Sequence, residues 1–337
     1  MRFTFVVPRL SSLDAALLAE SRPLARLASW SQARVEPLGI TAALLAAFGA
    51  PAADTAHDVP AAPLALLGAG VDPHASFVLA ADPVSLVAGR DDVALAARVD
   101  DLQTLEAHAL VDSLNAHFAS DGLVFHAPRP DTWFATLASR PALRTVPIER
   151  ALGTMLSAHA PGGADAGTWQ RWSTEIQMLL FAHPVNRRRE QQGRAMCNGT
   201  WFWGGGTLAD VGLGAPFRVH APDDRSGDLV RGLALHAGGE AMMLPGSFEA
   251  VIEAAPATRP ASHVAVVLPP PRDAASLATL EQAWIAPALA WLRSGRIASL
   301  VLVTDGERAM TWTARRPSLP ARLLSGFAPR RFAIPGR

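Results

Sequence analysis

The sequence predicts an α/β fold, with a mostly parallel sheet flanked by helices and a small α+β insertion. Three β-rich apolar runs carry this prediction, at Arg2 to Pro8, Ser262 to Pro270 and Ser299 to Gly306. The last two runs are almost continuously apolar, as strands buried on both faces are. Helical segments separate the runs, and this alternation indicates parallel strands joined by right-handed crossovers.

We expect residues 1–98 and 175–337 to form the core and residues 99–174 to form the insertion. Strands and helices alternate at both ends of the chain, and this pattern changes between them. We find no internal repeat, heptad array or low-complexity tract. A chain of 337 residues is long enough for such an arrangement.

The composition is that of a globular chain. Half of the residues are hydrophobic and 18% are charged, so we expect a substantial core. The formal net charge is zero, which gives no reason to expect a nucleic-acid or membrane partner. The single cysteine, Cys197, excludes an intramolecular disulfide and a thiolate-rich metal site. The N-terminus lacks a signal-peptide pattern and no apolar run is long enough to span a bilayer, so we expect a cytoplasmic protein.

The N-terminal part should continue from its first strand through helices to a second strand. Ser11 to Asp14 can cap a helix, and Pro37 to Ala50 predicts another. Residues 51–63 are rich in Ala, Pro and Asp, which is typical of a surface loop. Phe77 to Val84 predicts a strand that runs into a turn at Asp82, because aspartate before proline favours turns.

The expected insertion combines helices with two short strands. Leu102 to Phe118 carries apolar residues close to helical spacing, and the short runs Gly122 to His126 and Thr132 to Leu137 follow it. Asp165 to Phe181 predicts one long helix. Its buried stripe should consist of Trp169, Trp172, Ile176 and either Leu179 or Leu180.

The C-terminal part supplies further crossover elements. Gly227 to Gly239 predicts a helix ended by glycines, and Glu240 to Gly246 predicts a short strand. Leu277 to Leu292 predicts the helix between the last two buried strands.

The stretch from Glu175 to Gly206 concentrates several kinds of local chemistry. An apolar run ends at His183, and Pro184 begins a turn that opens into a charged segment. Cys197 to Trp203 then predicts a buried strand that feeds a tight glycine loop. A cysteine in such a strand is typical of an inert core thiol. The arginines and asparagines beside the strand fit either a structural ion-pair cluster or a polar binding site.

This stretch also carries a resemblance to a known family. HPVNRRREQQG followed by NGTWFWGGG resembles the HPVN-x-x-R…G…AN-x-x-W-x-WG-x-G segment of archaeal-type cofactor-independent phosphoglycerate mutases, in the alkaline phosphatase superfamily. The longer form from Glu175 is similar to a bacterial phosphoglycerate-mutase-like family, also known as regulator-of-pathogenicity-factors E type. The segments Asp82 to Asp91 and Asp228 to Gly246 extend the resemblance, although the bacterial family usually has His at the position of Ser85.

The resemblance implies an alkaline-phosphatase-like core and a site with two metal ions bound by Asp and His at strand ends. The aspartate that follows the first strand in the superfamily is replaced here by Pro8 and Arg9. A DEAGH-like segment is reduced to Asp273, and a DH pair is reduced to Asp305 followed by Gly306. The missing ligands predict that the chain has no metal cofactor and does not catalyse mutase chemistry.

Two functions remain open. The first is a catalytically degenerate mutase-like protein that binds a phosphorylated small molecule or a protein partner in a regulatory role. The second is an active phosphoglycerate mutase or phosphomonoester-processing enzyme with a rebuilt site and Mn or Zn. Guanidinium groups and backbone N–H groups can hold an anion at the candidate site. The candidate ligand-binding residues are Asn186, Arg187, Arg189, Asn198, Trp203, Gly204, Gly205, Gly206 and Asp305.

Overall fold

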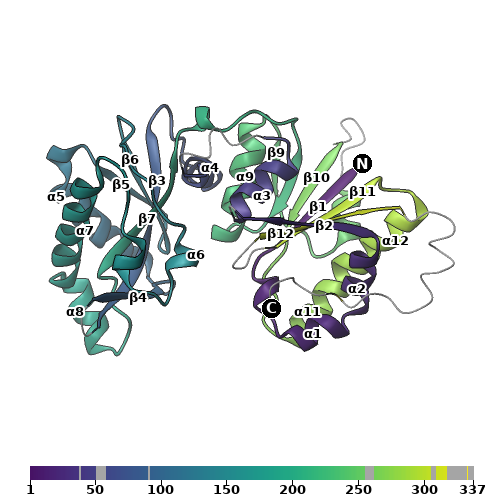
Figure 1. Cartoon of the computed structure of the whole chain (residues 1–337), viewed down its shortest axis with the longest axis horizontal. Helices are drawn as coiled ribbons and strands as arrows, with labels where there is room; N and C mark the ends of the chain where they lie inside the picture. Colours follow the sequence, from purple (N-terminus) through teal and green to yellow (C-terminus); the bar gives the residue numbers. More distant parts are fainter. Residues whose placement is uncertain are drawn as a thin grey trace. The chain divides into compact units, whose positions relative to one another are not determined.

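The computed structural model of the chain describes residues 1–37, 39–50, 58–89, 92–254, 262–304, 309–316 and 332. The chain divides into two compact units, each drawn with its own sheet in Figure 1. The first unit consists of Met1–Pro51 and Leu213–Arg337, and the second of Ala52–Gly212. The predicted boundaries therefore differ from those of the structure, because residues 52–98 and 175–212 belong to the second unit.

The pairing of β3 (Phe77–Ala88) with β7 (Gly199–Gly206) explains this difference. The two strands are antiparallel neighbours, with Ala80 opposite Trp203 and Val84 opposite Gly199. The sequence pattern shows that both segments are strands, but it does not show which strands they pair with. Their mutual pairing draws both flanking segments out of the expected core and into the second unit.

In the first unit, β1 lies at the centre of the sheet between β10 and β11, parallel to both. The strands, in sheet order, are β2 (Ser31–Glu36), β12 (Ala309–Arg315), β11 (Ser299–Thr304), β1 (Arg2–Val7), β10 (His263–Val267), β8 (Arg218–Ala221) and β9 (Glu240–Met243). The strand β12 is antiparallel to β11, and β2 is antiparallel to β12. The sheet is therefore mixed: four of its six described strand pairs are parallel, as the sequence predicted, and the two pairs that involve β12 are antiparallel. Four residues separate β11 from β12, which is too short for a parallel crossover.

Helices cover both faces of this sheet (Figure 1). Phe3 and Phe5 of β1 point to the face covered by five helices, where they pack into the main core of the unit. Those helices are α1 (Ala15–Glu20), α2 (Arg22–Ser29), α10 (Phe248–Glu253), α11 (Ala274–Leu280) and α12 (Ala286–Ser294). A π-helical turn at Glu281–Ile285 joins α11 to α12. On the other face, α3 (Ile40–Ala47) contacts β11 and β12, and α9 (Arg225–His236) contacts β8 and β10.

The described strand pairs of the second unit are all antiparallel. Its strands are β3, β4 (Val93–Arg98), β5 (Val124–Arg129), β6 (Thr132–Leu137) and β7. Its helices are α4 (Ala61–Gly68), α5 (Thr104–His117), α6 (Ile148–Ala151), α7 (Ala166–Phe181) and α8 (Pro184–Gln191). Helices α5 and α7 cover one face of the sheet and α4 the other (Figure 1). The structure confirms the buried stripe predicted for α7, namely Trp169, Trp172, Ile176 and Leu180.

None of the helices that the structure describes combines the length and the apolarity needed to cross a lipid bilayer.

Candidate functional site

The HPVN sequence begins a helix and not the turn expected from its proline. His183 is the N-cap of α8, and its Nδ1 accepts a hydrogen bond of 3.2 Å from the backbone N–H of Val185. Pro184 occupies the first helical position, where its missing N–H costs nothing. The other ring nitrogen of His183 lies 3.0 Å from Oγ of Ser113 on α5. Burial, with the nearby Arg188 charge, lowers the pKa of His183.

Asn186 joins α7 to the segment that enters β7. Its side chain is fully buried. Its Nδ2 donates hydrogen bonds to the carbonyl oxygens of Leu180 (2.8 Å) and Cys197 (2.7 Å). Its Oδ1 accepts from the backbone N–H of Cys197 at 2.8 Å. The amide is thus nearly saturated by backbone groups, which is the usual arrangement of a buried asparagine.

Arg189 is the buried centre of an ion-pair network. Its Nε donates to the carbonyl oxygen of Ala195 at 2.8 Å, its Nη1 donates to Glu106 Oε2 at 2.8 Å, and its Nη2 donates to Asp101. Arg194 adds a second cation, whose Nε lies 3.1 Å from Asp101. Burial raises the pKa of Asp101, but the hydrogen bonds from the two arginines outweigh it and leave that pKa below its usual value. The network fixes the N-terminal end of α5 to α8.

Asn198 and Trp203 hold β7 to β3. The side chain of Asn198 accepts a hydrogen bond from Leu86 N (2.7 Å) and donates one to Leu86 O (2.9 Å). The indole N–H of Trp203 donates to Asp82 Oδ2 at 2.7 Å. Asp82 is buried within β3, which continues through Pro83 to its end at Ala88. The turn predicted at Asp82 is therefore a strand interior.

In the structure, the polar groups of these candidate residues contact other parts of the chain, and ligand binding by them stays a prediction. Asn186, Arg189 and Asn198 direct their side chains at backbone groups and carboxylates of their own unit. Arg187 is exposed, although its neighbour Asn186 is buried. Adjacent helical residues differ by about 100° in direction, so the two side chains diverge. Asp305 lies outside the described residues.

The three glycines belong to β7 and not to the loop predicted after it. Gly204 and Gly205 together oppose the single residue Leu79 in the register of β3 and β7, which is a β-bulge. Gly204 has φ +66°, a left-handed conformation that glycine adopts at little cost. A Cβ at Gly205 would lie 2.7 Å from the Phe77 ring, and one at Gly206 would lie 2.5 Å from Pro60. Gly205 and Gly206 therefore permit close packing of β7 against Phe77 and Pro60.

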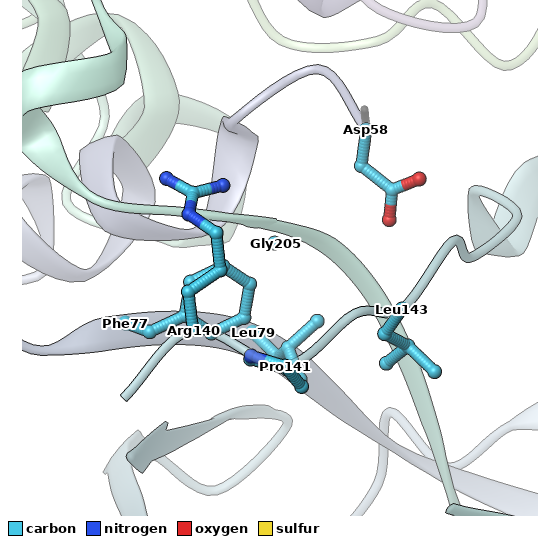
Figure 2. Close-up of a pocket in the computed structure, with 7 residues that line it drawn as sticks. All are labelled: Asp58, Phe77, Leu79, Arg140, Pro141, Leu143 and Gly205. Atoms are coloured by element: carbon cyan, nitrogen blue, oxygen red, sulfur yellow. The ribbon is translucent and has the colours of Figure 1, made fainter. Parts of the chain in front are cut away.

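A small pocket beside Gly205 is shown in Figure 2. Its volume is about 10 Å³, which is room for about one water molecule. The Arg140 guanidinium lies 5.2 Å from the Phe77 ring centroid and pairs with Asp210, while Asp58 accepts a hydrogen bond of 3.0 Å from the backbone N–H of Thr145. These charged groups are held by neighbours within the unit, and the pocket is too small for a phosphorylated molecule.

Cys197 is fully buried at the entrance to β7. Burial raises the pKa of its thiol to about 12, so the side chain stays protonated at neutral pH. A buried thiol of this kind is not a nucleophile, as expected from the sequence.

The carboxyl edge of the sheet in the first unit is a second candidate region, because open α/β sheets bind ligands at this edge. Arg9 follows β1, the central strand; it is exposed and has φ 57°. A left-handed backbone is uncommon for a residue that is not glycine. The sequence identifies Arg9 only as the residue that replaces an aspartate. No sequence pattern reveals that its backbone is left-handed.

Asp273, the carboxylate that remains after β10, is the N-cap of α11. Its Oδ1 accepts a hydrogen bond of 2.8 Å from the backbone N–H of Ser276. This hydrogen bond, with a second from the Ser276 hydroxyl, lowers the pKa of Asp273. Within the described ranges, no three His, Cys, Asp or Glu side chains cluster closely enough to share a metal ion.

Comparison with known proteins places the chain near one class of enzyme, although it matches no protein-family model. It is 25% identical over 147 residues to 2,3-bisphosphoglycerate-independent phosphoglycerate mutase 2 of Methanothermobacter thermautotrophicus, covering 43% of this chain and 37% of that one. It is 32% identical over 102 residues to the corresponding mutase of Methanothrix thermoacetophila, covering 28% and 25% of the two chains. The matches thus span less than two fifths of each of these curated relatives.

Two solved structures match nearly the whole chain. A protein from Pyrococcus horikoshii matches with a TM-score of 0.52 and 14% identity, covering 93% of this chain and 87% of that one. A cofactor-independent phosphoglycerate mutase from Thermoplasma acidophilum matches with a TM-score of 0.44 and 15% identity, covering 93% and 89%. The chain is therefore a weak homologue of archaeal-type cofactor-independent phosphoglycerate mutases, with a mixed α/β fold shared with the Pyrococcus protein.

Proposed function

We propose that this chain is a catalytically degenerate phosphoglycerate-mutase-like protein that binds a phosphorylated small molecule in a regulatory role. The weak homology to phosphoglycerate mutases suggests the class of ligand. The resemblance of its central segment to the regulator-of-pathogenicity-factors E family suggests the regulatory role. A ligand-dependent contact with a protein partner would transmit the signal.

Arg9 is the single observation that carries the proposal. It follows Pro8 at the end of the central strand, where the resemblance to the alkaline phosphatase superfamily implies a metal-binding aspartate. A guanidinium repels a divalent cation and has no lone pair with which to bind it. The same group attracts phosphate and can donate two parallel hydrogen bonds to it. The strained backbone of Arg9 is of the kind that concentrates at functional sites.

The supporting observation is the use of Asp273 as a helix cap. Its carboxylate accepts hydrogen bonds from Ser276, so the α11 terminus would lose its cap if the group turned to bind a metal ion. Arg9 thus places a cation after β1, and Asp273 places a helix-capping carboxylate after β10. This edge of the sheet suits an anion better than a pair of divalent metal ions.

Isothermal titration calorimetry of the full-length protein with 3-phosphoglycerate tests the proposed binding site. We expect saturable binding that Arg9→Ala weakens by about tenfold or more, because a hydrogen bond to a charged group contributes about 1.5–3 kcal/mol. The matched control is Arg34→Ala, which removes an exposed arginine from β2 in the same unit. Equal affinities of the wild type and the Arg9→Ala variant would show that the ligand does not bind at Arg9.

A further inference from the structure

His183 links three helices of the second unit, since it follows α7 closely, caps α8 and contacts α5. The three helices contact one another and lie together at one side of the unit in Figure 1. The His183 side chain is partly buried, and both of its ring nitrogens have partners. An N-cap is usually Ser, Thr, Asp or Asn. Unlike these residues, a histidine changes its charge between about pH 5 and pH 8.

The two hydrogen bonds of the ring fix which nitrogen carries the hydrogen. The hydroxyl of Ser113 donates its single hydrogen to the carbonyl oxygen of Ala109 at 3.0 Å, so it can only accept from His183. The Nε2 of His183 therefore carries the hydrogen. Its Nδ1 then presents a lone pair, which accepts the hydrogen bond from the backbone N–H of Val185. The cap of α8 thus exists only while the ring is neutral.

A second proton on the ring removes this cap. The proton must bind at Nδ1, which becomes a donor that faces the N–H of Val185 across 3.2 Å. The new positive charge also lies at the N-terminus of α8, where the helix dipole disfavours cations. Both effects act against the same part of the structure, the first turn of α8.

The charges around His183 come from its own helix and from the two helices packed against it. The titratable and charged residues of α5, α7 and α8 are Glu106, His108, Asp112, His117, Arg171, Glu175, Arg187, Arg188, Arg189 and Glu190. The glutamates of α5 and α7 are paired, with Arg189 and His117 respectively. Burial, and after it the charge of Arg188, lowers the pKa of His183. The folded surroundings therefore oppose the imidazolium.

The first turn of α8 also holds the segment that enters β7. The fully buried side chain of Asn186 donates to the carbonyl oxygen of Cys197 at 2.7 Å and accepts from its N–H at 2.8 Å. Cys197 is itself fully buried, and it is the only cysteine of the chain. When the first turn of α8 loosens, the hold of Asn186 on this segment is lost and the thiol becomes exposed.

We propose that His183 is a pH-sensitive switch, whose protonation releases the first turn of α8 and opens the segment around Cys197. The folded form resists a proton that the opened form accepts, because folding lowers the pKa of His183. The first turn is therefore most stable above pH 6.5, the ordinary pKa of histidine, and loses stability as the pH falls from 6.5 towards the lowered value. The switch lies in the second unit and does not depend on the phosphate site proposed at Arg9.

The single cysteine makes the opening measurable in the full-length protein. Cys197 is labelled with 4,4′-dithiodipyridine, and the rate is divided by that of the protein unfolded in guanidinium chloride at the same pH. The ratio gives the population in which the thiol is exposed. We expect this population to rise about tenfold from pH 8 to pH 5, because the cap is lost and the helix dipole opposes the new charge.

Two substitutions of His183 separate its charge from its cap. His183→Asn keeps a cap that cannot be protonated in this range, so Cys197 should stay protected at both pH values. His183→Ala has no cap, so the exposed population should be raised at both. The control His117→Asn, on α5, should keep the pH response of the wild type. An equal rise in His183→Asn, or no rise in the wild type, would overturn the proposal, and His183→Asn alone decides if His183→Ala does not fold.

The urea dependence of labelling distinguishes a local opening from unfolding of the whole second unit. The slope against urea scales with the surface that the opening exposes. We expect a shallow slope at pH 5 in the wild type, because only the first turn of α8 and the segment before β7 open. A slope as steep as that of global unfolding would contradict the proposed local opening.

Discussion

Arg189 lies at the centre of the polar network in the second unit, and its position explains why three consecutive arginines differ in role. The side chain of Arg189 is fully buried between Asp101 and Glu106, whereas Arg187 and Arg188 are exposed. A buried charge is tolerated only where partners satisfy it. Sequence reasoning recognised the cluster as functional or structural, but it did not show which arginine faces inward.

Removal of Arg189 should therefore strongly destabilise the second unit. We expect Arg189→Ala to lower the free energy of unfolding by about 2–5 kcal/mol, because it removes a fully buried side chain together with its three hydrogen bonds. Arg187→Ala on the same helix should change that free energy by less than about 0.5 kcal/mol. Urea unfolding followed by circular dichroism compares the two variants. Similar losses for both would mean that α8 presents a different face to the unit.

His263 gives the first unit a pH-dependent stability. Its Nε2 lies 2.8 Å from Thr4 Oγ1, and its ring stacks on Phe48 with a centroid distance of 4.6 Å. Burial, with the charge of Arg2, lowers the pKa of His263 from 6.5 to about 4. Between these two values the unfolded chain binds a proton that the folded chain does not, so the free energy of unfolding falls as the pH falls.

We expect His263→Gln to flatten this dependence. Between pH 6.5 and about 4, the free energy of unfolding of the variant should change less steeply with pH than that of the wild type. The difference in slope should be at most about 1.4 kcal/mol per pH unit, the value for one proton. His126, His183 and His220 also have lowered pKa values, so only the difference between variant and wild type isolates His263. Denaturation midpoints measured across this pH range give that difference. A slope that is unchanged in the variant would contradict the assignment.

Among the elements of the first unit, the strands with a continuous apolar pattern could be predicted, whereas β2 and β12 could not. The predicted runs match β1, β10 and β11, three buried strands in the interior of the sheet. The strand β2, with the sequence SQARVE, is largely exposed and has no apolar alternation. The strand β12 follows β11 closely and is the antiparallel neighbour that makes the sheet mixed. The edge position of β2 and the short connection before β12 explain why these segments are strands, and their composition does not.

The strand β7 also shows what spacing cannot reveal. A run of three glycines is typical of a loop, but here it continues a strand through a β-bulge against α4 and β3. The identity of the packing partners, Phe77 and Pro60, depends on the pairing of β3 with β7. That pairing joins segments more than a hundred residues apart, and local patterns hold no information about it.

Gly205→Ala tests this packing role directly. The added Cβ would lie 2.7 Å from Phe77 and 2.8 Å from Leu79, so we expect a loss of about 1–3 kcal/mol in the free energy of unfolding. Gly167→Ala in α7 is the matched control. An added Cβ at Gly167 meets no atom within 4 Å. Alanine is also more favourable than glycine in a helix by about 1 kcal/mol. The melting temperature should fall for Gly205→Ala and rise for Gly167→Ala. A Gly205→Ala variant as stable as the wild type would refute the packing role.

At the scale of the whole molecule, the chain combines a mixed α/β unit with an antiparallel unit inserted between β2 and β8. The sequence predicted the discontinuous core and the resemblance to phosphoglycerate mutases. It placed the boundaries wrongly, because it assigned the motif-bearing strand β7 to the core sheet. The same motif forms part of the second unit, whereas Arg9 and Asp273 follow the strands β1 and β10 of the first unit.

We propose that the carboxyl edge of the sheet in the first unit, with Arg9 after β1 and Asp273 capping α11, does not support metal-dependent phosphoryl transfer. An assay of the full-length protein for conversion of 3-phosphoglycerate to 2-phosphoglycerate in the presence of Mn²⁺ tests this proposal. We expect no turnover above that of a protein-free control, with or without added metal. Turnover that requires Mn²⁺ and disappears with EDTA would contradict the claim and establish a rebuilt metal site.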